Sequence, residues 1–194
     1  RSVVIGGSGA VTLSAAGVVT MKAGVDVNIT GSSGADTFKT TEAGFTASDV
    51  LAGGTGTDTL IFSDAATITS AELANKTAIE VIQFSGTGNS VVLSDAFVDA
   101  ADSDSVELAN STNTITSLDV SNVNALRTVV IGGSGAVTLS AAGAITLKNG
   151  VNTNITMSSG VDTITGGTGS DTLTIAEANF AATDTISGGT GTDT

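Results

Sequence analysis

Apolar residues recur along this chain in short triplets, most of which enclose one polar residue, and successive triplets begin eight or nine residues apart. The first part of the chain contains Val11-Thr12-Leu13, Val19-Thr20-Met21, Val27-Asn28-Ile29 and Asp36-Thr37-Phe38. This alternation predicts very short strands whose last residue points inward, each followed by a turn that contains Gly or Ser. Short strands separated by fixed turns predict an all-β fold, a parallel β-roll or β-solenoid in which each coil buries its apolar residues against the next.

The pattern also repeats at a longer interval. VVIGGSGAVTLSAAG occupies residues 3–17 and returns unchanged at 129–143, an offset of 126, whereas GGTGTDT at 53–59 returns at 188–194, an offset of 135. The second copy has therefore gained nine residues, in the region of TGGTGSDTL at 165–173. Because the pattern survives this gain, nine residues is the structural unit.

These repeats divide the chain into a complete module over residues 1–126 and a partial second copy over 127–194. In the first module, residues 3–61 form the solenoid run. Residues 62–126 supply connecting strands, predicted at IEVIQF (79–84), SVVLS (90–94) and SLDV (117–120), and the pattern leaves open whether they continue the solenoid. A helical spacing of 3.6 is not sustained, so only brief helices are expected, at the capping-box sequences that begin at Thr69 and Thr174.

Composition narrows the possible functions. The chain has 194 residues, a net charge of −13, six Lys and Arg, and no His or Cys. An acidic chain repels phosphate groups, so we expect no nucleic-acid partner, and no apolar run approaches the roughly 20 residues of a membrane span, so we expect no direct membrane insertion. Without His or Cys the common catalytic constellations cannot be built, which indicates that the segment is not an enzyme. Disulfides are excluded, so metal ions are the expected cross-link.

Three nonapeptides fit the pattern G-G-x-G-x-D-x-U-x, in which U is apolar: GGTGTDTLI (53–61), GGTGSDTLT (166–174) and GGTGTDT (188–194). GSSGADTFK (31–39) and MSSGVDTIT (157–165) fit it more weakly. The repeats resemble the RTX family of calcium-binding secreted proteins, and the chain is most similar to bacterial surface-layer (S-layer) proteins. The resemblance implies a β-roll whose Gly- and Asp-rich turns hold Ca²⁺ between turns two repeats apart. Calcium favours six or more oxygen ligands, which carboxylates and main-chain carbonyls supply.

The candidate metal ligands are the repeat aspartates and the turn glycines: Asp36, Asp49, Asp58, Asp162, Asp171, Asp184, Asp193, Gly53, Gly54, Gly56, Gly166, Gly167, Gly169, Gly188, Gly189 and Gly191. Three pairs of aspartates lie 22 residues apart and should stack on one edge each, namely Asp36 with Asp58, Asp162 with Asp184, and Asp171 with Asp193, whereas Asp49 should lie on the opposite edge. Two carboxylates about 4 Å apart repel by about 4 kcal/mol at an effective dielectric constant of about 20. Folding should therefore depend on calcium. The alternative is a row of solvated turn aspartates.

The same alignment predicts coils without calcium. Apolar or neutral residues replace the aspartate in the leading coils of each copy, at Val11, Val19 and Val27 and at Val137, Ile145 and Thr153. A separate acidic group, Asp99, Asp102, Asp104 and Glu107, lacks the glycine and the spacing of an EF-hand loop. A solvated acidic loop is favoured there over another calcium site.

The resemblance implies an extracellular protein of the bacterial cell surface that is exported by type I secretion. The favoured function is structural, an S-layer subunit that calcium stabilises and that self-associates into an extracellular array, with a polysaccharide anchor elsewhere in the full chain. Two alternatives remain. The segment would otherwise be the stalk of an RTX adhesin, or the calcium-binding region of a secreted enzyme or toxin whose catalysis lies elsewhere.

Overall fold

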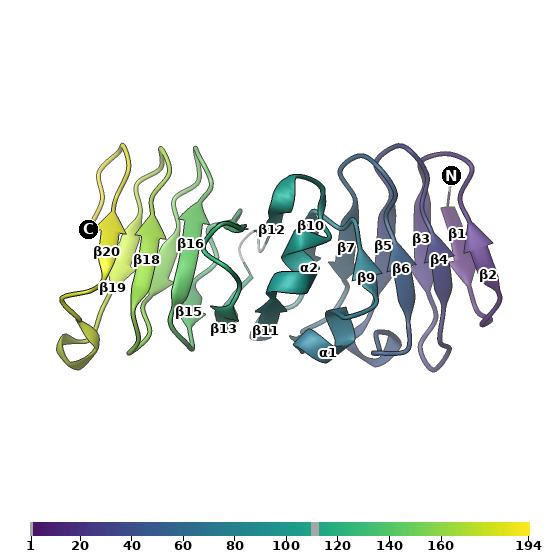
Figure 1. Cartoon of the computed structure of the whole chain (residues 1–194), viewed down its shortest axis with the longest axis horizontal. Coiled ribbons are helices and arrows are strands. Elements are labelled where there is room, and N and C mark those ends of the chain that lie inside the picture. The colour runs from purple at the N-terminus through teal and green to yellow at the C-terminus, as the bar shows by residue number, and fades with distance from the viewer. Residues whose placement is uncertain (1, 110–112) are drawn as a thin grey trace.

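The computed structural model describes residues 2–109 and 113–194 and shows an elongated stack of coils. One face is a ten-stranded sheet in which every neighbouring pair is parallel and the strands follow chain order (Figure 1). Its strands are β1 (Ser2–Ile5), β3 (Val18–Met21), β5 (Thr37–Thr40), β7 (Thr59–Phe62), β10 (Val81–Phe84), β12 (Ser105–Ala109), β14 (Thr128–Ile131), β16 (Gly143–Leu147), β18 (Asp162–Thr165) and β20 (Thr185–Ser187). The predicted parallel β-solenoid with short strands is confirmed.

The opposite face consists of two sheets. Four strands, β2 (Ala10–Thr12), β4 (Asn28–Thr30), β6 (Val50–Ala52) and β9 (Lys76–Thr77), form the first sheet. Six strands form the second: β8 (Thr67–Ile68), β11 (Asn89–Ser94), β13 (Ile115–Asn122), β15 (Val137–Leu139), β17 (Asn154–Thr156) and β19 (Thr172–Thr174). The break falls in the coil after β7, where helix α1 (Ser70–Leu73) separates β8 from β9 along the chain. Each coil thus contributes a strand to each face.

Residues 62–109 and 113–126 continue this stack rather than leaving it. Strand β10 pairs with β7 on one side and with β12 on the other, and β12 pairs with β14 of the second copy. The three runs predicted as connecting strands appear as β10, β11 and β13. The ten-stranded face is therefore continuous from one copy to the next.

The short helices agree only in part with the sequence. Helix α1 begins with the expected capping box, because the Glu72 amide donates to the Thr69 hydroxyl and the Thr69 amide donates to the Glu72 carboxylate. The capping box expected to begin at Thr174 does not form. Thr174 ends strand β19, and the 3₁₀ turn η3 (Glu177–Asn179) begins after Ala176 without a side-chain cap. The other short helical segments are α2 (Asp95–Asp99), η1 (Glu42–Gly44) and η2 (Asp102–Asp104).

The core is a narrow apolar layer between the two faces. Both outer residues of a triplet point inward, as at Val27 and Ile29, whereas only the last residue was expected to do so. Phenylalanines thicken the layer in the first half, where the rings of Phe62 and Phe84 stack with their centroids 6.1 Å apart. The position at the start of each triplet is thus an interior position, and the aspartates occupy it.

One nonapeptide corresponds to half a coil. In the first copy, EAGFTASD (42–49) links β5 of the ten-stranded face to β6 of the opposite face. Its counterpart EANFAATD (177–184) links β19 of the opposite face to β20 of the ten-stranded face. The nine residues gained by the second copy therefore move this turn from one edge of the solenoid to the other.

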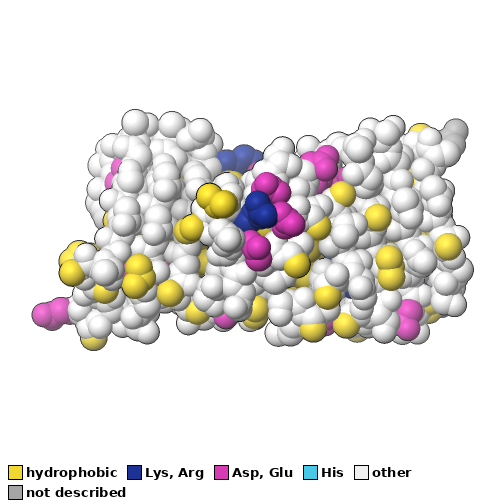
Figure 2. Space-filling view, viewed as in Figure 1, with side chains coloured by type: hydrophobic (Ala, Val, Ile, Leu, Met, Phe, Trp, Pro, Cys, Tyr) yellow, Lys and Arg dark blue, Asp and Glu magenta, His cyan; other side chains and the backbone are white. Residues whose placement is uncertain are grey.

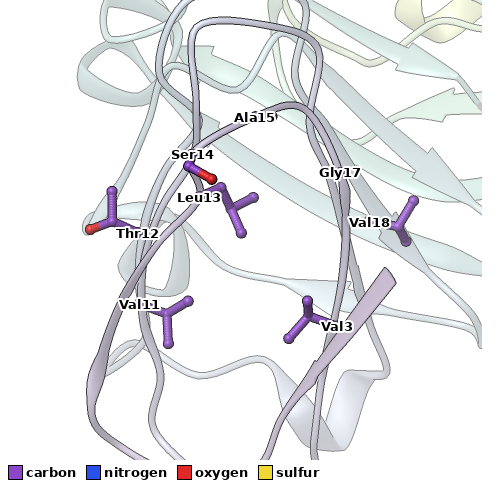
Figure 3. A pocket seen from close by; sticks show the side chains of 8 residues that line it. All are labelled: Val3, Val11, Thr12, Leu13, Ser14, Ala15, Gly17 and Val18. Atoms are coloured by element: carbon purple, nitrogen blue, oxygen red, sulfur yellow. The ribbon is translucent and has the colours of Figure 1, made fainter. Parts of the chain in front are cut away.

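The identical segments 3–17 and 129–143 have different surroundings. Val3 is 43% exposed and Val129 is 1% exposed, because β12 and β13 cover the second segment. In the first segment, Val3, Val11 and Leu13 line an open cavity of about 210 Å³ inside the first coil (Figure 3). Burial of the same sequence thus depends on the coil stacked against it.

Candidate metal-binding turns

The repeat aspartates lie at one repeated interior place, the inward-facing position at the start of a strand, here called the column position. Five of them are buried: Asp36, Asp49, Asp58, Asp162 and Asp171. Asp184 and Asp193 are partly buried. The alternative of solvated turn aspartates is therefore wrong for the five buried carboxylates, which stand among apolar core residues.

The carboxylates connect successive coils. The Asp36 amide donates to Asp58 Oδ1 at 2.6 Å, the Asp162 amide donates to Asp184 Oδ1 at 3.0 Å, and the Asp171 amide donates to Asp193 Oδ1 at 2.9 Å. Each of the three pairs 22 residues apart thus lies on adjacent coils. Asp36 and Asp58 lie on the first edge, where turns lead into the ten-stranded face.

The second edge carries the turns that lead into the opposite face. Asp49 lies there, and its Oδ1 accepts a hydrogen bond from the Val27 amide at 2.8 Å. Asp171 lies on the same edge, where its Oδ1 accepts from the Thr153 amide at 2.9 Å. The same hydrogen bond therefore occurs on both edges: a column carboxylate accepts from the amide of the column residue one coil earlier.

The strand register corrects the alignment of the leading coils. Val27 and Thr153 occupy the column position, as expected. The other four residues do not occupy it, because each pairs with the residue two positions after a column residue. The pairs are Val11 with Ile29, Val19 with Phe38, Val137 with Ile155, and Ile145 with Ile164. The leading triplets begin eight residues apart, but the paired residues lie 18 or 19 apart, so a triplet and the second triplet after it are not in register.

Glu80 is a member of the column that the sequence reasoning missed. The Asp58 amide donates to Glu80 Oε2 at 2.7 Å, and the Asp102 amide donates to Glu80 Oε1 at 2.8 Å. Glu80 lies 22 residues after Asp58 and directly before β10. That spacing was the available signal, but no glycine-rich nonapeptide surrounds Glu80.

Two column carboxylates have an oxygen without a partner. Asp58 Oδ2 and Asp171 Oδ2 are buried and accept no hydrogen bond within the described part of the chain. Both aspartates belong to strict motifs, GGTGTDTLI (53–61) and GGTGSDTLT (166–174). They lie on different edges, so the unpartnered oxygen follows the turn sequence and not the edge.

In the weaker repeats, a serine of the same turn donates hydrogen bonds to the carboxylate. Ser32 replaces the second glycine of the motif, and its amide and hydroxyl donate to Asp36 Oδ2 at 2.6 and 2.9 Å. Ser158 donates to Asp162 Oδ2 in the same way, at 2.9 and 3.0 Å. A buried carboxylate costs free energy unless its oxygens are bonded, and serine supplies those bonds locally.

Oxygen atoms pack closely against Gly53 beside Asp58. A Cβ atom on Gly53 would lie 1.9 Å from the Ala78 carbonyl oxygen and 2.5 Å from Asp58 Oδ2. The two following motif glycines, Gly54 and Gly56, have φ of 108° and 125°, which side chains disfavour. Oxygen atoms from two adjacent coils therefore converge where a side chain is absent.

The other motif glycines divide into two groups. Gly189 and Gly191 also have positive φ. Four more are packed too closely for a side chain: an added Cβ would lie 1.9 to 2.7 Å from a neighbouring oxygen, at Gly166, Gly167, Gly169 and Gly188. Positive φ thus accounts for some of these glycines, and close stacking of turns accounts for the rest.

The surroundings of Asp58 disfavour the charged form of its carboxylate. Burial raises its pKa to about 6, and the nearby carboxylates of Glu80, Asp36 and Asp102 also raise it, against the lowering effect of the hydrogen bond from the Asp36 amide. A positive ion beside Asp58 would favour the charged form. No group of three acidic side chains in residues 2–109 and 113–194 is arranged to hold a metal. An ion here would therefore take most of its oxygens from the main chain.

Lys76 is a buried cation on the second edge. Its ammonium donates to the carbonyl oxygens of Thr46 and Asp49, both at 2.7 Å. Burial lowers the pKa of Lys76 to about 8, while the carboxylates of Asp49 and Glu72 raise it. Lys76 is thus positively charged at neutral pH, with its charge beside the Asp49 turn.

The acidic group expected as a solvated loop is ion-paired instead. Arg127 contacts Asp99 and lies 3.0 Å from Asp104 Oδ2, and Lys148 Nζ lies 2.7 Å from Glu107 Oε1. Figure 2 shows acidic side chains gathered around a basic one near the middle of this face. Asp99 and Asp104 remain about half exposed. Basic side chains of the chain itself therefore balance most of this group.

Comparison with known proteins supports the interpretation of the motif. Residues 44–61, 158–174 and 180–194 match the model of the RTX calcium-binding nonapeptide repeat. These segments include six of the seven candidate aspartates and omit Asp36. No curated protein and no solved structure matched the chain. The matched repeat is a structural calcium-binding unit, and proteins that carry it are typically secreted.

The described residues contain no helix with the length and apolar character needed to cross a bilayer.

Proposed function

We propose that this chain is a structural calcium-binding repeat region of a secreted protein, with calcium held at its strict glycine turns. The observation that carries the proposal is the pair of buried, unpartnered oxygens, Asp58 Oδ2 and Asp171 Oδ2. A divalent cation beside them would supply the positive charge that burial requires. The motif match to a calcium-binding repeat covers both residues.

The residues fit calcium by chemistry. Calcium favours carboxylate and carbonyl oxygens, and Asp58 Oδ2 and the Ala78 carbonyl oxygen converge beside Gly53. Ala78 belongs to the coil after Gly53, since Thr77 and Ala52 are paired. Calcium at this place would therefore cross-link adjacent coils, and we infer the same role for Asp171 in the second copy.

For the whole protein, we propose an S-layer subunit that self-associates into an extracellular array. The continuous parallel ladder, the module repeated at an offset of 126 residues and the acidic composition support a long, uniform scaffold. Calcium would order the coils and bridge subunits. Export by type I secretion and a polysaccharide anchor elsewhere in the full chain belong to the same proposal.

Calcium counting tests the first part of the proposal. Isothermal titration with CaCl₂ should show that Asp58→Asn and Asp171→Asn each bind fewer ions than the wild-type chain. Asp26→Asn is the matched control, because Asp26 is exposed and outside the column. A wild-type chain that binds no calcium, or variants that bind as many ions as the control, would contradict the proposal.

Electron microscopy of the purified protein with calcium tests the second part. The proposal predicts ordered two-dimensional sheets that disperse in chelator. Particles that stay monomeric at high protein and calcium concentrations would show that the protein does not self-associate, and this result would contradict the proposed S-layer function.

A further inference from the structure

Lys76 is a core-facing lysine in a solenoid whose interior is mainly apolar. It pairs with Leu51 across β9 and β6, and it is 1% exposed. Its stem therefore fills the place of a leucine. Its ammonium reaches back across the coil boundary to the turn that contains Asp49.

That turn is capped by side chains from the following coil. Lys76 donates to the Thr46 and Asp49 carbonyls, and Asn75 Nδ2 donates to the Ala47 carbonyl at 2.9 Å. The ammonium also lies 4.8 Å from the centroid of the Phe45 ring, within the range of a cation–π contact. Three carbonyl oxygens of residues 46–49 are therefore occupied by donors of the chain itself.

The carboxylate of Asp49 differs from that of Asp58. Asp49 Oδ1 accepts from the Val27 amide, and Oδ2 accepts from the Thr46 amide at 2.7 Å. Neither oxygen lacks a partner, whereas Asp58 Oδ2 does. The Asp49 turn thus has a positive charge beside it and no acceptor left unpartnered on its carboxylate.

The second copy contains the same turn in different surroundings. Asp184 Oδ1 accepts from the Asp162 amide and Oδ2 from the Ala181 amide, which reproduces the bonding of Asp49. Phe45 is 3% exposed beneath Lys76, but its counterpart Phe180 is 64% exposed. The carboxylate bonding is therefore a property of the turn sequence, and the buried cation is a separate addition to the first copy.

We propose that the Lys76 ammonium is a tethered cation that takes the place of calcium at the Asp49 turn. This turn then holds its fold without metal, although residues 44–61 as a whole match the calcium-binding repeat. The inference rests on the proposed calcium binding only for its contrast with Asp58. A divalent ion next to a buried ammonium would be repelled, so Asp49 would not bind calcium in the wild-type chain.

The first test compares bound calcium in single variants. Asp49→Asn should bind as many ions as the wild-type chain, while Asp58→Asn should bind fewer. Fewer ions in Asp49→Asn would overturn the inference. If the wild-type chain binds no calcium, the proposed function fails, and the second test still decides the role of Lys76.

The second test removes the charge in the presence of chelator. Lys76→Met keeps an apolar stem of similar length, and its folding equilibrium constant should fall about tenfold or more, because the two hydrogen bonds to the Thr46 and Asp49 carbonyls are lost. Lys39→Met is the matched control, because Lys39 is exposed on β5. Equal denaturant midpoints for the two variants in chelator would overturn the inference.

Discussion

Asp49 occupies the interior position that Val27 occupies one coil earlier, so a carboxylate stands where the fold also accepts a valine. Such an exchange is tolerated only if the carboxylate oxygens are bonded. Asp49 meets this condition with main-chain amides, and Asp36 meets it with Ser32. Asp58 does not, and this difference between residues of one column predicts which of them depend on calcium.

Asp58→Asn should change stability in opposite directions with and without calcium. In chelator the variant should be at least as stable as the wild-type chain, because a buried negative charge without a counter-ion is removed. In excess calcium it should be less stable, by about the 2.7 kcal/mol that binding at 100 times the dissociation constant supplies. Thermal melts under both conditions measure this.

Asp36→Asn is the comparison for that experiment. Both oxygens of Asp36 accept hydrogen bonds from the chain. The variant should therefore lose stability whether or not calcium is present. An Asp58→Asn variant that behaves like Asp36→Asn would show that the unpartnered oxygen has no special dependence on the ion.

The stability of the calcium-free chain should also depend on pH through Asp58. Its pKa is raised to about 6 in the folded chain, above the ordinary value of 3.8. The folded chain therefore binds the proton more tightly, and this contribution is present below pH 4 and lost as the pH rises through 6. In chelator, the stability advantage of Asp58→Asn over the wild-type chain should shrink from pH 7 to pH 5. A constant difference across this range would contradict the raised pKa.

At the scale of elements, the sequence predicted strands better than it predicted their register. The alternation in 79–84, 90–94 and 117–120 predicted β10, β11 and β13, because side chains of period two must face a core. Val19 was misplaced by two residues, since the spacing of the triplets does not show that its partner in the next coil lies 19 residues away. Only the pairing of Val19 with Phe38 resolves this.

The helical segments show the same limit. Helix α1 was predicted because its capping box is a local signal of two residues, Thr69 and Glu72. Helix α2 (Asp95–Asp99) is too short to show a helical period, and its start is marked only by Ser94, whose hydroxyl accepts from the Phe97 amide. The partners of Glu80 and Lys76 come from neighbouring coils, and no local pattern reports them.

The duplicated segment allows a test of coil stacking with a built-in control. Val129→Ala should destabilise the chain by about 2 kcal/mol, because Val129 is buried beneath the coil that contains β12 and β13. Val3→Ala changes the same residue in the same local sequence, but Val3 is 43% exposed and should cost less than half as much. Urea denaturation of both variants measures the difference. Equal losses would mean that the local sequence, and not the stacked coil, determines the effect.

At the scale of the whole molecule, the charges differ along the axis. In the middle coils, Arg127 and Lys148 form ion pairs with acidic side chains, and Lys76 places its charge at the main-chain carbonyls of the Asp49 turn. The two carboxylates with an unpartnered oxygen, Asp58 and Asp171, lie on either side of Arg127 and Lys148 along the chain, in turns with the strict motif. The acidic chain thus combines coils held by its own cations with coils that we propose to be held by calcium.

The melting temperature of the intact chain with and without calcium tests this account most directly. Far-UV circular dichroism should show β structure that melts at a clearly higher temperature in excess calcium than in chelator, and the shift should be lost in the double variant Asp58→Asn/Asp171→Asn. Equal melting temperatures of the wild-type chain in calcium and in chelator would contradict the account.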